Sequence, residues 1–513
     1  MPTLLLTALA GALLLALLYL RPTRGRLPPG PRALPLLGNL PQLLPAPLFL
    51  RLHALTAKYG DLYTLRLPGA TIVVLGSARA QADVLDRLGA VTSGRPRFVM
   101  AGEIMTRNLL YAFMPYGERW RRLRRVTHEG FNIRACASYY PFQSSEAANL
   151  VLSLLSPAVS VSSPSALPDK LKHAAAASTW RSLYSGPSLT AEDEERVRRV
   201  DEVADDVLRA SIPLSSVVDV FPWLDNLPAW AAPWRKRGER WFERTDAFFR
   251  GVLELGKQQE KGQQHHKGFI ASTADSFERF AVTEQEAAWT AGGLFAAGVE
   301  TTASSLHVFV QAMILYPTVA RTAQAHLDRV CGARPPGFDD REMLPYLQAM
   351  VKEVLRWKPV AALGIPHVAE EDVEYRGYVI PKGTLLMGNI WSISHDPAFF
   401  PSPDVFDPTR FLDASGQVKE PFPDYHDDTV AYGSGRRICP GRDFANNTLF
   451  IDMAYLLWAF DFAPGTDERG TQVLPNPDKY QDHGLMIHPS LFPYTLTPRR
   501  PDLRDIIASA SAQ

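Results

Sequence analysis

The hydrophobic pattern is most regular between Thr283 and Pro317. The stretch opens with Thr283 to Glu286, where a threonine is followed three residues later by glutamate, the form of a helix-capping box. No proline interrupts it before Pro317, and apolar residues such as Leu294 and Val308 fall on several sides of a helix. We therefore expect a helix of more than thirty residues that crosses the molecule through its core.

Two shorter stretches earlier in the chain have the composition of strands. Tyr63 to Leu67 and Thr71 to Leu75 are joined by Pro68-Gly69-Ala70, so we expect a hairpin of a modest sheet. Most later segments have a helical pattern, and the predicted fold class is mainly α with a smaller β portion. The 513 residues show no internal repeat and no clear linker, which favours a single catalytic domain over residues 41–513.

The first twenty residues are almost entirely apolar. Thr3 to Leu20 carry no charge, and a helix of that length reaches roughly 27 Å, about the thickness of the hydrocarbon layer of a membrane. Arginines follow this run and nothing basic precedes it, which favours an uncleaved anchor with the remaining chain on the cytosolic side over a signal peptide. We predict one transmembrane helix over residues 1–20 and a basic, proline-rich hinge over residues 21–40.

Composition and charge exclude several classes of protein. Apolar residues make up 46% of the chain, too many for a mainly disordered or fibrous protein. Lys plus Arg equals Asp plus Glu at 54 each, so no overall field attracts nucleic acid. The three cysteines are scattered and odd in number, which indicates a reducing compartment rather than a disulfide framework.

Polar residues interrupt the middle of the long helix. Ala297 to Thr302 contains a glycine, a glutamate and two threonines, which are poor choices for a buried helix. One interpretation is a local bend in which a threonine hydroxyl bonds back to the carbonyl of Ala297. The other is that the same bend opens a groove beside a reacting ligand.

An acid and a base lie three residues apart near the end of another predicted helix. Glu353 and Arg356 share a helix face just before Pro359 ends the helix. Arg410, framed by aromatic residues and proline, offers a second guanidinium that could complete a buried triad on Glu353. A solvated surface pair is the alternative interpretation.

One cysteine lies in an unusual loop. From Ala431 to Gly441 three glycines and a proline surround Cys439, which suits tight turns and the close approach of a flat ligand. Arg436 and Arg437 are expected to help keep a thiolate ionised. Two functions fit: a nucleophile with a histidine base, or a thiolate metal ligand in a cofactor pocket.

A second basic cluster spans Tyr116 to Arg125. On a helix Trp120 and Arg124 share one face, while Arg121, Arg122 and Arg125 point elsewhere. One face could bind an anionic cofactor and the other a protein partner. A solvated basic helix is the alternative.

In their order along the chain these features resemble a microsomal cytochrome P-450, over practically the whole sequence. Within that family, Arg356 to Pro359, Gly364 to His367 and Ile380 to Gly383 are similar to the fungal group that includes O-methylsterigmatocystin oxidoreductase. The motifs that carry the resemblance are the apolar amino terminus with its proline hinge, Trp120-x-x-x-Arg124, Ala297-Gly298-x-Glu300-Thr301, Glu353-x-x-Arg356, Phe406-x-Pro-x-Arg410-Phe411 and the Cys439 loop.

The resemblance implies a heme b cofactor and a role for each motif residue. It implies that Cys439 is the axial thiolate ligand of the iron. It also implies that Glu300 and Thr301 deliver protons in an oxygen groove. The remaining roles are heme propionate binding by Trp120, Arg124, His367 and Arg437, and a structural triad formed by Glu353, Arg356 and Arg410.

The resemblance further implies a monooxygenase that inserts one oxygen atom from O2 into a hydrophobic small molecule, in fungal secondary metabolism or detoxification. Electrons would come from NADPH-cytochrome P-450 reductase through FAD and FMN, at the endoplasmic reticulum membrane. Arg121, Arg122, Arg125 and Arg442 are candidates for meeting that reductase. Two alternatives are a heme-thiolate isomerase or dehydratase, and a non-enzymatic membrane-tethered heme sensor.

By the same resemblance, five segments are expected to form the wall of the substrate pocket. They are mainly apolar, as a hydrophobic ligand requires. One loop residue departs from the family: Tyr432 stands where phenylalanine is usual, and its hydroxyl is expected to tune the thiolate by hydrogen bonding. The pocket segments are Arg95 to Phe113, Phe221 to Trp234, the face of Leu294 and Phe295, Val360 to Ile365, and Gly484 to Met486.

Overall fold

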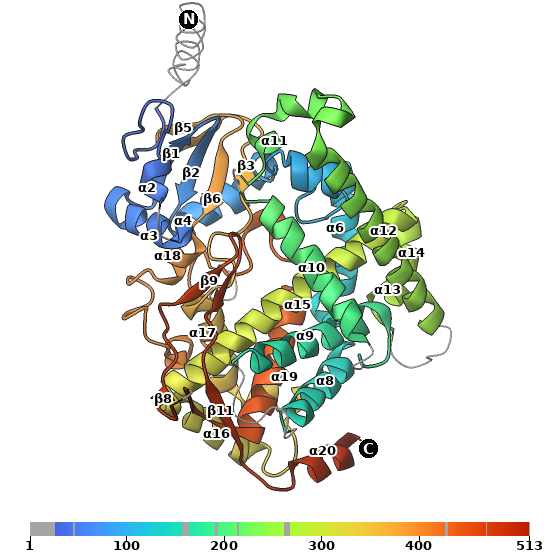
Figure 1. The fold of residues 1–513 in the computed structure, drawn as a ribbon. Coiled ribbons are helices and arrows are strands. Elements are labelled where there is room, and N and C mark those ends of the chain that lie inside the picture. Colours follow the sequence, from blue (N-terminus) through green and yellow to red (C-terminus); the bar gives the residue numbers. More distant parts are fainter. Residues whose placement is uncertain are drawn as a thin grey trace, which may run out of the picture.

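The computed structural model shows a mainly helical protein with small sheets toward one side (Figure 1). It describes residues 26–44, 47–155, 164–189, 193–212, 215–260, 267–425, 429–467 and 469–511. The longer helices are α3 (Leu48–Tyr59), α6 (Glu118–Phe131), α8 (Tyr140–Leu154), α9 (Ala166–Tyr184), α10 (Glu194–Ala210), α12 (Pro233–Glu260), α15 (Glu284–Leu315), α16 (Pro317–Val330), α17 (Pro345–Trp357), α19 (Arg442–Ala459) and α20 (Leu503–Ser511).

Short helical segments connect these helices. Two of them, η1 (Ala82–Arg87) and η2 (Val99–Met105), are π-helical. The others are α2 (Leu40–Leu43), α4 (Ala78–Gln81), α5 (Gly89–Thr92), α7 (Ile133–Ala137), α11 (Val217–Val220), η5 (Pro222–Asn226), η6 (Ala229–Ala231), α13 (Phe269–Ser272), α14 (Ala274–Arg279), η7 (Phe338–Met343), α18 (Ile390–Ser394), η8 (Pro408–Phe411) and η9 (Gly435–Arg437).

The largest sheet has four strands in the order β1-β2-β6-β3. The predicted hairpin is confirmed: β1 and β2 pair antiparallel, with Tyr63 opposite Val74, and β2 then pairs parallel with β6. The other strands form small sheets β11-β7-β8, β9-β10 and β4-β5. The strands are β1 (Leu62–Leu67), β2 (Ala70–Leu75), β3 (His367–Val368), β4 (Val373–Tyr375), β5 (Tyr378–Ile380), β6 (Leu385–Gly388), β7 (Phe460–Thr466), β8 (Gln472–Val473), β9 (Tyr480–Asp482), β10 (Ile487–Pro489) and β11 (Tyr494–Pro498).

The long helix predicted from the hydrophobic pattern is α15. It has 32 residues, and the side chains of Thr283 and Glu286 close the capping box at its start. Figure 1 shows it crossing the middle of the molecule, with α9 and α10 nearby and α19 behind. Its first half packs into one buried apolar cluster and its second half into another, so the polar residues from Glu300 to Thr302 lie where two cores meet.

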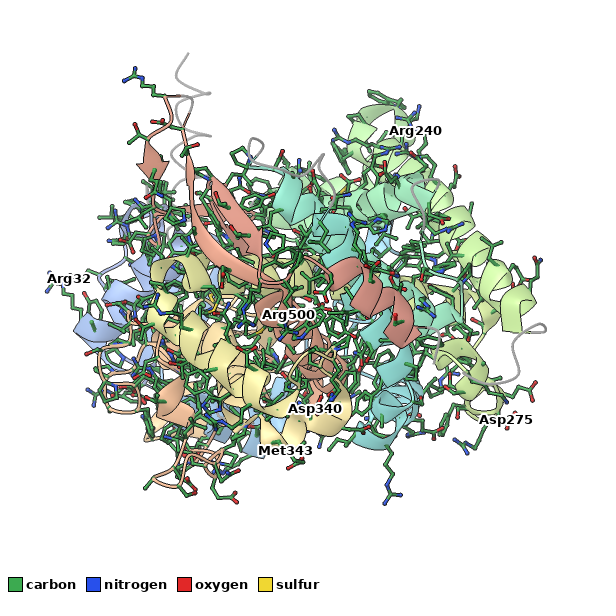
Figure 2. All side chains as sticks on the ribbon, turned by 90° about the horizontal axis from the view of Figure 1, so that it is seen from below. Arg32, Arg240, Asp275, Asp340, Met343 and Arg500 are labelled. Atoms are coloured by element: carbon green, nitrogen blue, oxygen red, sulfur yellow. The ribbon has the colours of Figure 1, made fainter. Side chains whose placement is uncertain are left out.

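The predicted membrane anchor over residues 1–20 and the first part of the hinge lie outside the described residues. Among the residues that are described, no single helix is long and apolar enough to cross a membrane. In the same part of the chain, the sharply bent pair α15 and α16 passes this test by length and composition. Polar side chains cover the periphery, where Figure 2 shows Arg32, Arg240 and Asp275 projecting outward.

Candidate functional site

The Cys439 loop is a set of tight turns that leads into α19. Gly433 and Gly435 have φ of +74° and +69°, a region that favours glycine, and a Cβ atom on Gly435 would lie 2.0 Å from the carbonyl oxygen of Leu85. The backbone N–H of Cys439 donates to the carbonyl of Tyr432 over 2.9 Å. The glycines therefore fix the loop against its neighbours, and the thiol with it.

Two cations that the sequence did not single out for the Cys439 thiol act on it most strongly. Burial raises the pKa of the thiol, and the amide of Gly441 and the guanidiniums of Arg124 and Arg442 act in the opposite direction. The expected contribution of Arg436 and Arg437 stays a prediction. A thiol in such a place becomes a thiolate when it binds a cation, as a metal ligand does.

A histidine base for a nucleophilic cysteine is also missing from the part of the chain that the structure describes. No histidine there forms a hydrogen bond with the Cys439 thiol, and the groups that influence its pKa are arginines, an aspartate and an amide. The geometry favours the metal-ligand interpretation over the nucleophile.

Two of the predicted propionate-binding residues, Arg437 of the loop and Trp120 of α6, are in contact. The guanidinium of Arg437 lies 4.5 Å from the ring centre of Trp120, and it donates to the carbonyls of Ser93 and Met114. Its third nitrogen, Nη1, and the indole Nε1 of Trp120 are buried without a hydrogen-bond partner. Two unpartnered buried donors are what an anionic group of a cofactor would satisfy, so these residues fit a heme propionate.

His367 lies near Arg437, whose positive charge contributes to lowering the pKa of the histidine. Burial and the charge of Arg95 lower the pKa of His367 well below 6.5, so the ring is neutral. Its Nδ1 donates to the carbonyl of Thr92 over 2.8 Å, which fixes the tautomer. Arg124 is held differently, by the carbonyl of Ile438 at 2.8 Å and the Tyr111 hydroxyl at 3.3 Å.

Arg95 is a site residue that the sequence analysis placed only in the pocket wall. It is partly buried, and its guanidinium donates to the carbonyls of Ala112, Ile365 and Pro366. Its charge acts on both His367 and Arg437. Among the described residues Arg95 has no acidic ion-pair partner, and it lies near Arg437, which is also partly buried. Two such arginines are a signal for an anionic ligand that becomes visible only in the fold.

One face of α15 stays accessible although the helix crosses the core. Leu294 and Thr301 are partly buried and Ala297 is exposed, at intervals of three and four residues. The Thr301 hydroxyl donates to the carbonyl of Ala297 over 2.7 Å, as the local-bend interpretation predicted. This face gives the helix an internal surface that a ligand can reach.

Glu300 points into a polar cluster rather than toward Thr301. Its Oε2 lies 3.1 Å from Nζ of Lys172, and its Oε1 lies 3.3 Å from Nε2 of His488. These partners were not predicted, because Lys172 and His488 are far from Glu300 along the chain. The proton-relay roles of Glu300 and Thr301 remain predictions.

The structure brings the three residues of the expected triad into contact. Arg356 donates two hydrogen bonds to Glu353, at 2.6 and 2.9 Å, and Arg410 donates a third at 3.2 Å. The surface-pair alternative is wrong, because the side chains of Glu353 and Arg356 are 0% and 1% exposed. The triad lies at the end of α17, held against η8.

The expected pocket segments meet at one hydrophobic cluster. Partly buried side chains from all five segments pack against it, but Phe295 does not belong to the wall. It is fully buried between Trp180 and Tyr184, so that expectation was wrong. The contributing side chains are Leu110, Ala112, Leu224, Trp234, Leu294, Ile365 and Leu485.

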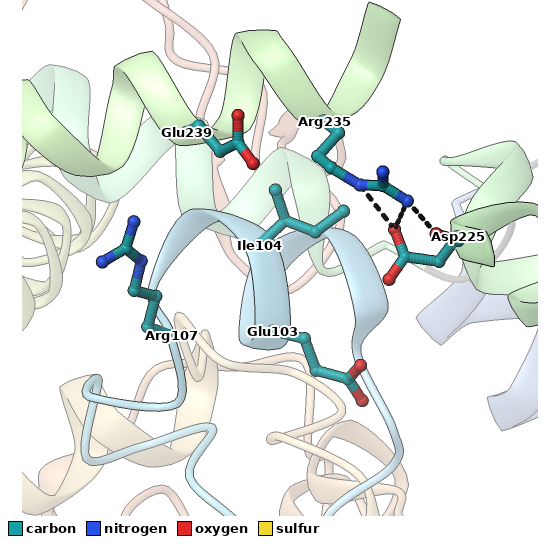
Figure 3. A pocket seen from close by; sticks show the side chains of 6 residues that line it. All are labelled: Glu103, Ile104, Arg107, Asp225, Arg235 and Glu239. Atoms are coloured by element: carbon teal, nitrogen blue, oxygen red, sulfur yellow. Dashed lines mark hydrogen bonds and ion pairs between the residues drawn. The ribbon is translucent and has the colours of Figure 1, made fainter. Parts of the chain in front are cut away.

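A separate hollow of about 170 Å³ lies between η2 and α12 (Figure 3). It is charged rather than apolar: Arg235 pairs with Asp225 on one side, and the guanidinium of Arg107 lies 4.0 Å from the ring centre of Phe242 on the other. Glu239 faces the same space. Its mixed charges distinguish this hollow from the hydrophobic cluster at which the five pocket segments meet.

The basic face of α6 is only partly free. Arg121 and Arg125 are exposed and lie near Glu118, whereas Arg122 donates to the carbonyls of Phe280 and Ala281. The Tyr432 hydroxyl donates to Oδ1 of Asn446 over 2.8 Å. The expected tuning of the thiolate by this hydroxyl stays a prediction.

Known proteins resemble this chain in sequence and in fold. Cytochrome P450 monooxygenase 253 of Postia placenta is 41% identical over 507 residues, which cover 98% of this chain and 95% of the relative. Cytochrome P450 monooxygenase aneD of Aspergillus aculeatus is 35% identical over 494 residues, 95% of this chain and 91% of the relative. A zebra fish cytochrome P450 structure with abiraterone superposes with a TM-score of 0.70 at 26% identity, covering 88% of this chain and 100% of that one.

The narrower likeness to the O-methylsterigmatocystin oxidoreductase group remains a prediction. The family assignment does not depend on it, since the sequence profile described as Cytochrome P450 matches residues 28–494. That range contains the Cys439 loop, the buried Glu353 triad and the cluster around Arg437. The chain therefore belongs to the cytochrome P450 family and is one of its monooxygenases.

Proposed function

We propose that this monooxygenase inserts one oxygen atom from O2 into a hydrophobic small molecule, using heme b and electrons from NADPH through an FAD- and FMN-containing reductase. The observation that carries the proposal is the pair of unpartnered buried donors on Trp120 and on Arg437 of the Cys439 loop, which suit an anionic group of a heme. Apolar side chains from the five pocket segments meet at one cluster and suit a hydrophobic substrate. The fungal relatives support a role in fungal secondary metabolism or detoxification.

The residues of this chain hold the cofactor and control its surroundings. Cys439 supplies the iron ligand, and thiolate-ligated heme activates dioxygen for oxygen insertion. Trp120 and Arg437 offer their unpartnered donors to a propionate, with Arg95 and neutral His367 next to them. Glu300 and Thr301 lie on the accessible helix and deliver protons.

We also infer that the protein is attached to the endoplasmic reticulum membrane with its catalytic domain in the cytosol. Several large apolar side chains are exposed, among them Trp230 at 84% and Trp223 at 63%. Leu36 and Leu37, near the start of the described chain, are exposed as well, and Figure 1 shows both segments toward the same end of the molecule. Arg121 and Arg125 are free enough to meet an acidic reductase surface.

The test is spectroscopic and then chemical. Reduced protein under carbon monoxide should show the Soret band of a thiolate ligand, and NADPH with reductase should oxidise members of a hydrophobic library. A band at the heme-imidazole position would disprove the assignment of Cys439. A thiolate band without any NADPH-dependent turnover would favour an isomerase, a dehydratase or a heme sensor.

Thr301→Ala offers a second test of the same function. Without the hydroxyl, oxygen consumption should continue while product per NADPH falls. Unchanged coupling would refute the role of Thr301.

A further inference from the structure

Glu300 is one of two carboxyl groups that share a lysine. Nζ of Lys172, on α9, lies 2.9 and 3.0 Å from the two carboxylate oxygens of Asp201 on α10, and 3.1 Å from Oε2 of Glu300 on α15. The contact of Nζ with Oε2 of Glu300 is an ion pair rather than a hydrogen bond, and the charge of Glu300 also acts on the Asp201 carboxyl. We refer to Asp201, Lys172 and Glu300 as the lysine bridge.

The other oxygen of Glu300 is held by a histidine. Nε2 of His488 lies 3.3 Å from Oε1 of Glu300, and Nδ1 of His488 lies 2.5 Å from the hydroxyl of Ser304. Burial, together with His483 and Lys172, lowers the pKa of His488 to about 4. The ring is therefore neutral at pH 7, donates from Nε2 to the carboxylate and accepts from Ser304, so it holds Glu300 in place without supplying a proton.

The lysine bridge runs from the interior toward water. The side chain of Glu300 is 10% exposed, whereas those of Lys172 and Asp201 are each 28% exposed. Among the described residues, the other titratable groups beside the cluster are His483 and Asp205, and they pair with each other at 3.9 Å at the surface. Asp201 is thus the carboxyl in the bridge that solvent reaches.

We propose that Asp201 is the positioning residue through which Glu300 exchanges protons with water, with Lys172 as the bridge between them. The proposal rests on the proposed function, because it assigns the supply route of the proton that Glu300 delivers. None of the sequence motifs includes Asp201 or Lys172. The three residues come together only because α9 and α10 pack against α15.

The transfer conserves protons and charge. Protonated Asp201 gives its proton to Nζ of Lys172 as Lys172 gives one of its own to Oε2 of Glu300. Lys172 ends as an ammonium, Asp201 as a carboxylate and Glu300 as a carboxylic acid. Asp201 then takes a new proton from water, so that no group other than solvent is consumed.

The local electrostatics agree with this direction of transfer. Burial and the neighbouring Glu300 raise the pKa of Asp201 to about 6, against the lowering effect of Lys172. Asp201 can therefore hold a proton near neutral pH, which an ordinary aspartate cannot. The two carboxylates outweigh burial and raise the pKa of Lys172, so the bridge remains cationic in the resting state.

The first test follows the proton in the resting protein, independent of turnover. Infrared titration of the heme-loaded wild type should show a carboxylic acid that loses its proton with a midpoint near pH 6. Asp201→Asn should lack this titration and Asp201→Glu should retain it. Asp205→Asn is the matched control, because Asp205 lies on the same helix but pairs outward with Arg209 and His483. A titration that persists in Asp201→Asn would overturn the proposal.

The second test measures product formed per NADPH. In Asp201→Asn the coupling should fall roughly tenfold, less than the about hundredfold loss expected for a group that acts directly. Wild-type coupling should decrease as the pH rises through about 6, whereas the Asp201→Asn profile should be flat there, with Asp201→Glu restored and Asp205→Asn normal. Wild-type coupling and pH profile in Asp201→Asn would overturn the delivery role. A wild type without the thiolate band would instead refute the proposed function, while the infrared titration would still decide whether Asp201 and Glu300 share a proton.

Discussion

Glu353 and Glu300 are both buried with cationic partners, and their surroundings differ. Glu353 accepts hydrogen bonds from Arg356, Arg410 and the backbone of Asp407, at 2.6 to 3.2 Å, and its side chain has no solvent exposure. Glu300 has longer contacts, at 3.1 Å to Lys172 and 3.3 Å to His488, and its partners reach water.

This difference separates a structural ion pair from a reactive one. Arginine donates through a rigid fork, so the Glu353 site is fixed, and a proton has no path to it. Lysine can lose a proton, and the lysine bridge gives Glu300 a neighbour that exchanges with solvent. Burial alone therefore does not identify a catalytic acid; the kind of partner and its access to water do.

The largest expected effect comes from removing the charge of Glu353. We call Glu353 and its arginine partners the sealed site, because the Glu353 side chain has no solvent exposure. Glu353→Gln leaves two buried guanidiniums without their counter-ion, so the free energy of unfolding should fall by about 3–5 kcal/mol. Urea unfolding of the heme-loaded protein measures this. Glu118→Gln is the control, because Glu118 pairs with Arg121 at the surface, where such pairs contribute about 0–1 kcal/mol. Equal effects of the two changes would contradict the distinction between sealed and open sites.

Acid should destabilise the protein through His395, a buried histidine on which the charge of Arg356 acts. Burial and the charge of Arg356 lower the pKa of His395 from 6.5 to about 3, so between these values the unfolded chain binds a proton that the folded chain does not. Stability is therefore lost as the pH falls below 6.5, by about 1.4 kcal/mol per pH unit for this histidine. His395→Gln should make the pH dependence of unfolding shallower by that amount.

The Glu300 cluster supplies the control for the pH experiment. His488, with its pKa lowered to about 4, loses stability in acid in the same way. Asp201, with its pKa raised from 3.8 to about 6, gains stability as the pH falls through that window, because its folded form binds the extra proton. The two effects offset each other, so the double change Asp201→Asn and His488→Gln should leave the slope near that of the wild type. A slope altered as much as in His395→Gln would show that the two groups do not balance.

Glu300→Gln should impair coupling more than stability, the reverse of what is expected for Glu353→Gln. Glutamine can still accept from His488, and Lys172 keeps Asp201, so unfolding should become easier by only about 1 kcal/mol. Coupling of NADPH to product should fall about hundredfold, because glutamine cannot carry the proton. Oxygen and product measurements at matched substrate occupancy check this, and unchanged coupling would remove Glu300 from the mechanism.

The sequence was sufficient for features that depend on local pattern. The capping box at Thr283 and the stop at Pro317 predicted α15 to within a residue at each end, and spacing placed Glu353 and Arg356 on one face. The partners of Glu300 could not be predicted in this way, because Lys172 and His488 come from elements more than a hundred residues away on either side. Arg95 was missed as a site residue for the same reason: only the fold shows that it lies partly buried near Arg437.

The smallest expected effect tests whether the Tyr432 hydroxyl only anchors the Cys439 loop or also acts on the thiolate. The Tyr432 hydroxyl donates to Asn446 on α19, while its backbone carbonyl accepts from the Cys439 amide. Tyr432→Phe keeps the backbone contact and removes one partly buried hydrogen bond, so unfolding should become easier by about 0.5–1.5 kcal/mol. Because the hydroxyl bonds to α19 rather than to the thiol, the reduction potential of the iron should not change. Potentiometric titration of both proteins measures this, and a shifted potential with unchanged stability would mean that the hydroxyl acts on the thiolate after all.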